Sequence, residues 1–148
     1  MIVDAYYSDS LPFHLTTQEF LLEVKGIMAP GGVLAYNVIS SAEGSGSDLF
    51  RSMYRTASGV WDGLWVFPIG IGDDDAARTR RNIIVLATDM EITERELVER
   101  IESRVDGAVS IEGFAEMAAD LYTDPVAVAD VPLLTDAHAP TDSLIEVQ

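Results

Sequence analysis

The feature that most constrains the fold is an amphipathic helical segment between two apolar segments. Residues 1–6 and 33–39 both read as strands, and the second shows little alternation, as is typical of a parallel strand covered on both faces. Thr16 and Glu19 predict a capping box at the start of the helix, and Pro30-Gly31-Gly32 predicts its end. The apolar residues between them recur at helical spacing: Phe20, Leu21, Val24, Ile27 and Met28. This order predicts one right-handed crossover unit with a parallel strand pair.

A second helix and two further strands follow in the sequence. The polar loop 40–47 leads into a helix that ends at Asp62-Gly63 and carries an apolar face of Leu49, Phe50, Met53, Tyr54, Ala57 and Val60. Residues 64–69 and 82–88 are predicted strands. No helical pattern lies between these two, so we expect them to pair in antiparallel fashion.

The last third of the sequence predicts helices followed by an extended arm. Thr93 and Glu96 predict a second capping box, for a helix that carries Leu97, Val98 and Ile101 and ends near Gly107. A short helix is predicted over residues 112–121. The remainder is too proline-rich for long elements and is expected to wrap the body as an extended arm, with prolines at Pro125, Pro132 and Pro140.

Length and composition fit a single domain, residues 1–148. With 48% hydrophobic residues the chain can form a real core. Residues 1–90 form the strand and helix part, and residues 91–148 form the C-terminal helices and tail. The chain begins within a strand pattern, so we expect the C-terminal half of a larger α/β enzyme. No apolar run approaches the roughly 20 residues of a membrane span, no leader pattern is present, and cysteine is absent. A cytoplasmic protein is expected.

The charge balance excludes one class of partner. The formal net charge is −16, Lys25 is the only lysine, and the only basic cluster is Arg78, Arg80 and Arg81. Nucleic acid binding needs clustered cations, so it is not expected. Beyond Arg104 there is no lysine or arginine, and this acidic segment is expected to attract cations such as polyamines. The alternative is a solvated acidic surface without a ligand.

Asp4 is the first candidate for chemistry, because ligands of open α/β sheets bind beyond the carboxyl ends of parallel strands. It is a candidate general base, with Tyr6 and Tyr7 as an aromatic wall; the alternative is a turn aspartate beside core aromatic residues. His14 has no second ligand or nucleophile at a recognisable spacing and is expected to be structural. No metal-ligand spacing is present, and no metal is expected.

Two polar loops are weaker candidates for binding sites. Residues 43–48 precede a helix and offer an anion site, but they match neither the Walker nor the dinucleotide pattern, which favours a flexible loop. Three consecutive acids, Asp73-Asp74-Asp75, cannot all face one cation, so a solvated loop is expected there.

Three separated stretches resemble the polyamine aminopropyltransferase (spermidine synthase) family, and more closely its spermidine-synthase-like prokaryotic branch. The resemblance spans nearly the whole chain. The stretches are Asp4-Ala5-Tyr6 with residues 12–20, Ala29-Pro30-Gly31-Gly32-Val33 with Asn37, and residues 131–140.

The resemblance implies a Rossmann-like fold of the class I methyltransferase type, with an antiparallel last strand and a C-terminal helical and extended arm. This chain would form the second half. It implies that Asp4 is the catalytic aspartate that orients the attacking amine and accepts its proton. The implied substrate-binding residues are Tyr6, Tyr7 and Asp9. The implied contacts to the co-substrate, decarboxylated S-adenosylmethionine, are Asp4, Ala5 and Pro12, and no tightly bound cofactor is implied.

The sequence departs from the family pattern at two places. Tyr7 stands where well-characterised members carry a second aspartate, and Arg80-Arg81-Asn82 replaces their Gly-Gln-Ile-Gly-Phe pattern before the last strand. Two other functions therefore stay open: an S-adenosylmethionine-dependent methyltransferase-like protein and a non-catalytic acidic interaction module. The expected partner is a polyamine or another cationic small molecule. The expected assembly is a homo-oligomer, or a pair with a missing N-terminal half.

Overall fold

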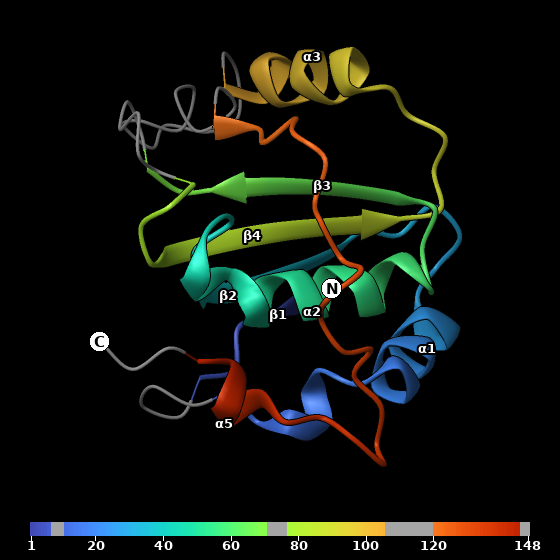
Figure 1. The fold of residues 1–148 in the computed structure, drawn as a ribbon. Helices are drawn as coiled ribbons and strands as arrows, with labels where there is room; N and C mark the ends of the chain where they lie inside the picture. Colours follow the sequence, from blue (N-terminus) through green and yellow to red (C-terminus); the bar gives the residue numbers. More distant parts are fainter. Residues whose placement is uncertain (7–10, 71–76, 106–119, 146–148) are drawn as a thin grey trace.

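A four-stranded sheet forms the centre of the computed structural model, which describes residues 1–6, 11–70, 77–105 and 120–145 of the 148. The strand order is β1 (Ile2–Val3), β2 (Leu34–Ser40), β4 (Arg81–Thr88) and β3 (Gly63–Pro68). β1 is parallel to β2, and β4 is antiparallel to both β2 and β3 (Figure 1). A mixed α/β sheet with an antiparallel last strand, and the antiparallel pairing of the last two strands, are thus confirmed.

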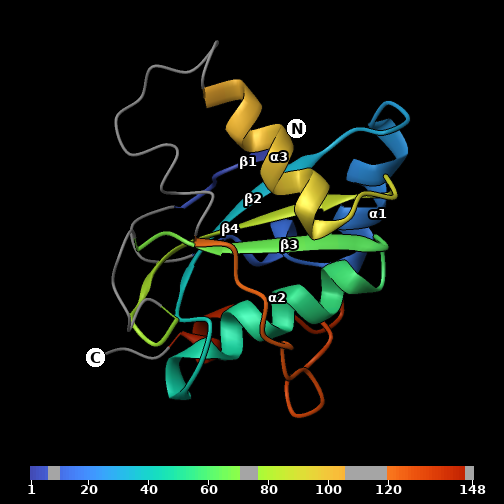
Figure 2. The same ribbon diagram turned by 90° about the horizontal axis from the view of Figure 1, so that it is seen from above.

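Helices cover the two faces of the sheet unequally (Figures 1 and 2). One face packs against α1 (Gln18–Ile27), α2 (Asp48–Ser58) and the short α5 (Thr141–Leu144), while α3 (Glu94–Val105) lies on the other side. Side chains of β2 alternate: Leu34, Tyr36, Val38 and Ser40 are buried in the first layer, and Ala35, Asn37 and Ile39 are half-buried on the opposite face. The expectation that β2 is fully covered on both faces is therefore wrong. No helix in the described part of the chain is long and apolar enough to cross a bilayer.

The first helix begins one residue later than the capping-box pattern predicts. Thr17, not Thr16, caps α1, with its Oγ1 accepting from Phe20 N at 3.2 Å. Thr16 is buried and donates its hydroxyl to Phe13 O at 2.6 Å, within the 3₁₀ turn Phe13–Leu15. Glu19 turns away and accepts from Asp136 N at 3.0 Å. The Thr16–Glu19 capping box is wrong because the turn and the arm take both of its side chains.

The second capping box is confirmed. Thr93 N and Thr93 Oγ1 both donate to Glu96 Oε2 at 2.8 Å, and Glu96 N donates to Thr93 Oγ1 at 3.3 Å. The bond from the Thr93 backbone, followed by the one from its hydroxyl, lowers the pKa of Glu96 below its usual value. This reciprocal arrangement satisfies two backbone donors at the start of α3.

Other boundaries differ from expectation at the ends of elements. β1 spans only Ile2–Val3 rather than residues 1–6, because the chain leaves the sheet at Asp4. α2 ends at Ser58, followed by Gly59, rather than at Asp62-Gly63. The predicted helix over 112–121 and the acids at 73–75 fall outside the described residues, apart from 120 and 121.

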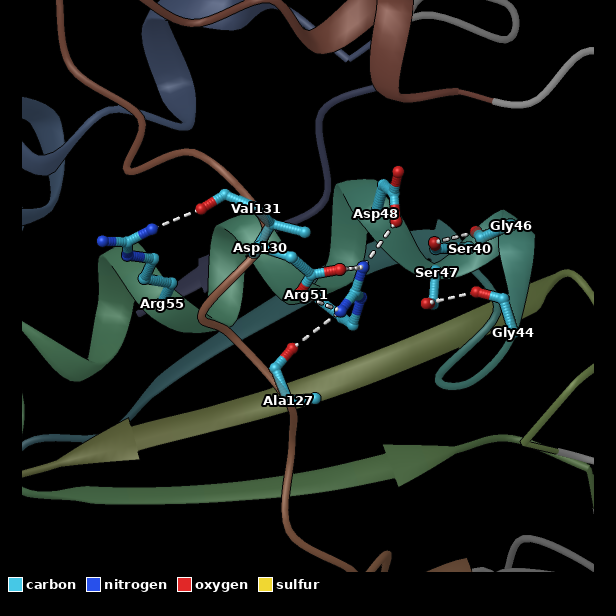
Figure 3. Close-up of polar contacts among 10 residues, drawn as sticks. All are labelled: Ser40, Gly44, Gly46, Ser47, Asp48, Arg51, Arg55, Ala127, Asp130 and Val131. Carbon is cyan, nitrogen blue, oxygen red and sulfur yellow. Dashed lines mark hydrogen bonds and ion pairs between the residues drawn. The ribbon is translucent and has the colours of Figure 1, made fainter.

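The C-terminal segment forms the expected extended arm, with α5 as its one helix among the described residues. The arm crosses α2, and Figure 3 shows Arg51 and Arg55 of that helix pointing at it. Arg51 pairs with Asp130 at 2.7 Å, and Arg55 donates to Val131 O. Leu134 N donates to Thr56 Oγ1 at 3.0 Å, inside the core. These contacts make the arm a part of the folded body.

Tyr122 joins the arm to the loop after β2, and its ionisation is a test of that contact. Its hydroxyl donates to Glu43 Oε1 at 2.9 Å, and desolvation, followed by this bond, raises its pKa to about 12. Its pKa in the unfolded chain is about 10. The neutral phenol therefore stabilises the fold below pH 10, and this contribution is lost as the pH rises through about 12.

The absorbance titration of the wild type minus that of Tyr122→Phe is expected to show one phenol ionising near pH 12 in the folded chain. The same difference in urea is expected to show it near 10, as for an exposed tyrosine. A difference curve centred near 10 in the folded chain would refute the contact.

Candidate active site

Asp4 stands at the carboxyl end of β1 and is held by an amide network across three strands. Asn37 Nδ2, from β2, donates to Asp4 Oδ1 and to Asn82 Oδ1, from β4, both at 3.0 Å. The Oδ1 atom of Asn37 is buried and has no partner among the described residues. All three side chains thus meet on the less covered face of the sheet.

This arrangement favours a ligand that donates hydrogen bonds and carries positive charge. Asp4 is exposed, so the carboxylate is oriented by Asn37 and stays accessible to solvent. An ionised carboxylate only accepts hydrogen bonds, and so does an amide oxygen. A buried acceptor without a partner is rare in native proteins and needs an explanation. An ammonium group, which carries three donors and a positive charge, matches the exposed Asp4 carboxylate.

The hydroxyl of Tyr6 accepts a hydrogen bond from a backbone N–H of β2 that lies beyond the end of the short β1. Ala35 N donates to Met1 O at 2.9 Å, and four residues further on Ile39 N donates to the Tyr6 hydroxyl at 2.5 Å. Burial raises the pKa of Tyr6; the bond from Ile39 and the Arg80 cation lower it, and the Asp4 carboxylate raises it. Tyr6 is therefore neutral at physiological pH and lies within the fields of both charges.

A pocket of about 250 Å³ opens beyond the carboxyl end of β2. Its wall includes the turn after β2, where Ser40 Oγ donates to Gly46 O at 2.9 Å and Ser47 Oγ donates to Gly44 O at 2.6 Å (Figure 3). Gly44 has a φ of 79°, a left-handed conformation that favours glycine. Residues 43–48 thus form a hydrogen-bonded turn that leads into α2. The remaining wall includes Ile39, Ser41, Leu49, Arg78, Arg80, Leu144 and Ile145.

The structure places the other expected site residues apart from the Asp4 network or leaves them undescribed. Ala5 is half-buried between Asp4 and Tyr6. Pro12 opens the 3₁₀ turn before α1, where its carbonyl accepts from Leu15 N at 2.9 Å. Tyr7 and Asp9 fall outside the described residues.

His14 is exposed, and its ring meets the edge of Phe13 at 5.7 Å between centroids. Within the described ranges, no group of three or more His, Asp or Glu side chains is placed to hold a metal ion.

Sequence reasoning missed the roles of Asn82 and Arg80. Both lie next to the start of β4, and the sequence does not indicate that β4 pairs with β2. In that pairing Asn82 lies opposite Ile39, which brings its side chain beside Asn37. The alternation of side chains along a strand could have identified Asn82. Once the register of β4 on β2 is known, this alternation puts Asn82 and the half-buried residues of β2 on the same face of the sheet.

No protein-family model and no curated protein matches this sequence. The fold is similar to the crystal structure of a probable spermidine synthase from Corynebacterium glutamicum, with a TM-score of 0.51 and 21% sequence identity. The alignment covers 88% of this chain and 49% of that chain, so this chain spans about half the length of its structural neighbour. At this identity the likeness concerns the fold. The chain has a mixed α/β, Rossmann-like fold of the kind found in that probable spermidine synthase.

Proposed function

We propose that this chain is the amine-binding half of an aminopropyltransferase, with Asp4 as the residue that orients the amine and takes its proton. The observation that carries the proposal is the Asp4 carboxylate, which Asn37 holds just past the carboxyl end of β1 and which is exposed to solvent. In this proposal the chain forms the C-terminal half of a class I methyltransferase-type sheet. The alignment to 49% of the structural neighbour supports a match to half of such a fold.

The proposed reaction transfers the aminopropyl group of decarboxylated S-adenosylmethionine to a primary amine. At neutral pH the amine is protonated and cannot attack. Asp4 binds the ammonium and accepts its proton, and the freed nitrogen lone pair attacks the carbon next to the sulfonium. The C–N bond forms as the C–S bond breaks. The electron pair of the broken bond stays on sulfur, which leaves as the neutral thioether methylthioadenosine.

The resemblance supplies the roles of the remaining residues in this proposal. Tyr6, with Tyr7 and Asp9 as proposed by the resemblance, contacts the amine. Ala5 and Pro12, together with Asp4, contact the adenosyl donor. Asn37 positions Asp4, since its Nδ2 donates to the carboxylate.

A product assay tests the proposal. A protein that combines this chain with the other half of the fold is incubated with a panel of amines and either donor, decarboxylated S-adenosylmethionine or S-adenosylmethionine. Methylthioadenosine is expected from the first donor, and the isolated chain is expected to form no product. S-adenosylhomocysteine from the second donor would instead establish methyl transfer, and the absence of both products would favour the non-catalytic module.

Association through the β1 edge is a further expected property. β1 lies at the end of the strand order, and beside it Met1, Ile2 and Val33 are 49%, 81% and 38% exposed. An open apolar strand edge offers unpaired backbone groups to another chain. The isolated chain is expected to dimerise or oligomerise in light scattering at moderate salt. A monomer at high micromolar concentration would contradict this.

A further inference from the structure

The described lining of the pocket at the carboxyl end of β2 carries a net charge opposite in sign to that of the chain as a whole. The chain carries nine basic residues against 25 acidic ones, yet Arg78 and Arg80 both line this one pocket. Glu43 is the only acidic residue of its described lining.

The arginines are held at the pocket by the backbone. Ala77 O accepts from both Ala42 N and Glu43 N at 2.7 Å, which fastens the segment before β4 to the turn after β2. Arg78 Nε then lies 3.4 Å from Glu43 Oε2, a long and exposed contact that leaves most of the Arg78 guanidinium available. The wall that carries both arginines is therefore built into the fold.

Arg80 differs from Arg78 because its charge has no acidic partner in the described part of the chain. It directly precedes β4, whose first residue, Arg81, pairs in register with Ser40 at the carboxyl end of β2. Arg80 thus lines the pocket and lies two residues before Asn82, which Asn37 connects to Asp4 by hydrogen bonds. Its charge lowers the pKa of the Tyr6 phenol, which the Asp4 carboxylate raises.

We propose that the pocket binds the carboxylate of the acceptor amine, with Arg80 contacting the carboxylate while Asp4 binds the ammonium of the same molecule. This inference rests on the proposed function and narrows it: the acceptor is a small amino acid with separated charges, instead of a plain diamine. A guanidinium matches a carboxylate with two parallel hydrogen bonds, which a lysine cannot reproduce. A diamine would bring its second ammonium against the guanidinium, and like charges at contact oppose binding.

Three probes with the same carbon skeleton length separate the possibilities: 4-aminobutyrate, 1,4-diaminobutane and butyrate. Each is titrated into the ¹⁵N-labelled 148-residue chain, and the amide shifts of the turn at Gly44 and Gly46 are followed. 4-Aminobutyrate is expected to bind about 10-fold more tightly than either other probe, since it alone satisfies both charges. Arg80→Ala is expected to remove this preference, and Arg80→Lys to restore only part of it.

Arg95→Ala is the matched control, because Arg95 lies on α3 with its side chain 84% exposed. It is expected to leave all three affinities unchanged. Equal or tighter binding of the diamine by the wild type, an unchanged preference in Arg80→Ala, or no binding of 4-aminobutyrate would each overturn the inference.

The failure of the inference and that of the proposed function give different results. Binding of 4-aminobutyrate that depends on Arg80 but not on Asp4, as measured with Asp4→Asn, would support the carboxylate subsite and contradict the role of Asp4 in binding the amine. Amine binding that depends on Asp4 and is unchanged in Arg80→Ala would support the proposed function and contradict the carboxylate subsite.

Discussion

In the proposed aminopropyltransferase, replacing Asp4 by asparagine is expected to lower turnover by about 100-fold or more, while the fold is kept. The neutral amide at position 4 can still accept the hydrogen bond from Asn37 Nδ2, so the local geometry should persist. The amide cannot accept the proton of the attacking ammonium or balance its charge. A 100-fold loss corresponds to about 2.7 kcal/mol of transition-state stabilisation. The expected loss of turnover is measured as the rate of methylthioadenosine release at a saturating amine concentration.

Asp62→Asn provides a matched control, because Asp62 is an exposed aspartate after α2 and belongs to no proposed site. Its turnover is expected to equal that of the wild type. Near-normal turnover in Asp4→Asn, with the same melting temperature, would show that Asp4 is not the base.

Replacing Leu134 by alanine is expected to destabilise the chain by about 2–5 kcal/mol, the range for a large apolar side chain removed from a core. Leu134 belongs to the arm, but its side chain is 0% exposed within the core cluster. Its backbone is fixed on both sides: its N donates to Thr56 Oγ1 at 3.0 Å, and its O accepts from Gln18 N at 2.9 Å. The surroundings therefore cannot collapse easily into the cavity.

Urea denaturation followed by circular dichroism measures this loss, with Leu133→Ala as the control. Leu133 is the neighbouring leucine and is only half-buried, so a smaller loss is expected for it. If Leu134→Ala stays within about 0.5 kcal/mol of the wild type, the arm contributes no core and is only a surface strap.

The order of the elements could be predicted because each depends on local pattern. The helical spacing before Pro30, the apolar run of β2 and the Thr93–Glu96 capping box all act within a few residues of the chain. The start of α1 was misplaced because Thr16 and Thr17 are equivalent caps by type. The choice between them is made by Phe13 O, which takes the Thr16 hydroxyl, and by the arm, which takes Glu19.

The candidate site could be predicted only in part, because its geometry depends on strand pairing. The position of Asp4 follows from the end of β1, but its contact with Asn37 requires the parallel register of β1 on β2. Asn82 and Arg80 lie near the candidate site only because β4 lies between β2 and β3 in the sheet. The contacts of the arm were not predictable for the same reason: Arg51 and Arg55 lie four residues apart on α2, but their partners in the arm lie 76 or more residues further along the chain.

Titration of the labelled chain with butylamine, followed at the side-chain amide of Asn37, is the most direct test that this site binds an amine. The account predicts a saturable shift of the Asn37 Nδ2 resonances in the wild type, because an ammonium at Asp4 changes the carboxylate to which that amide donates. Asp4→Asn should abolish the shift. A shift of equal size in Asp4→Asn, or shifts confined to acidic residues of the arm such as Asp124 and Asp130, would contradict the account.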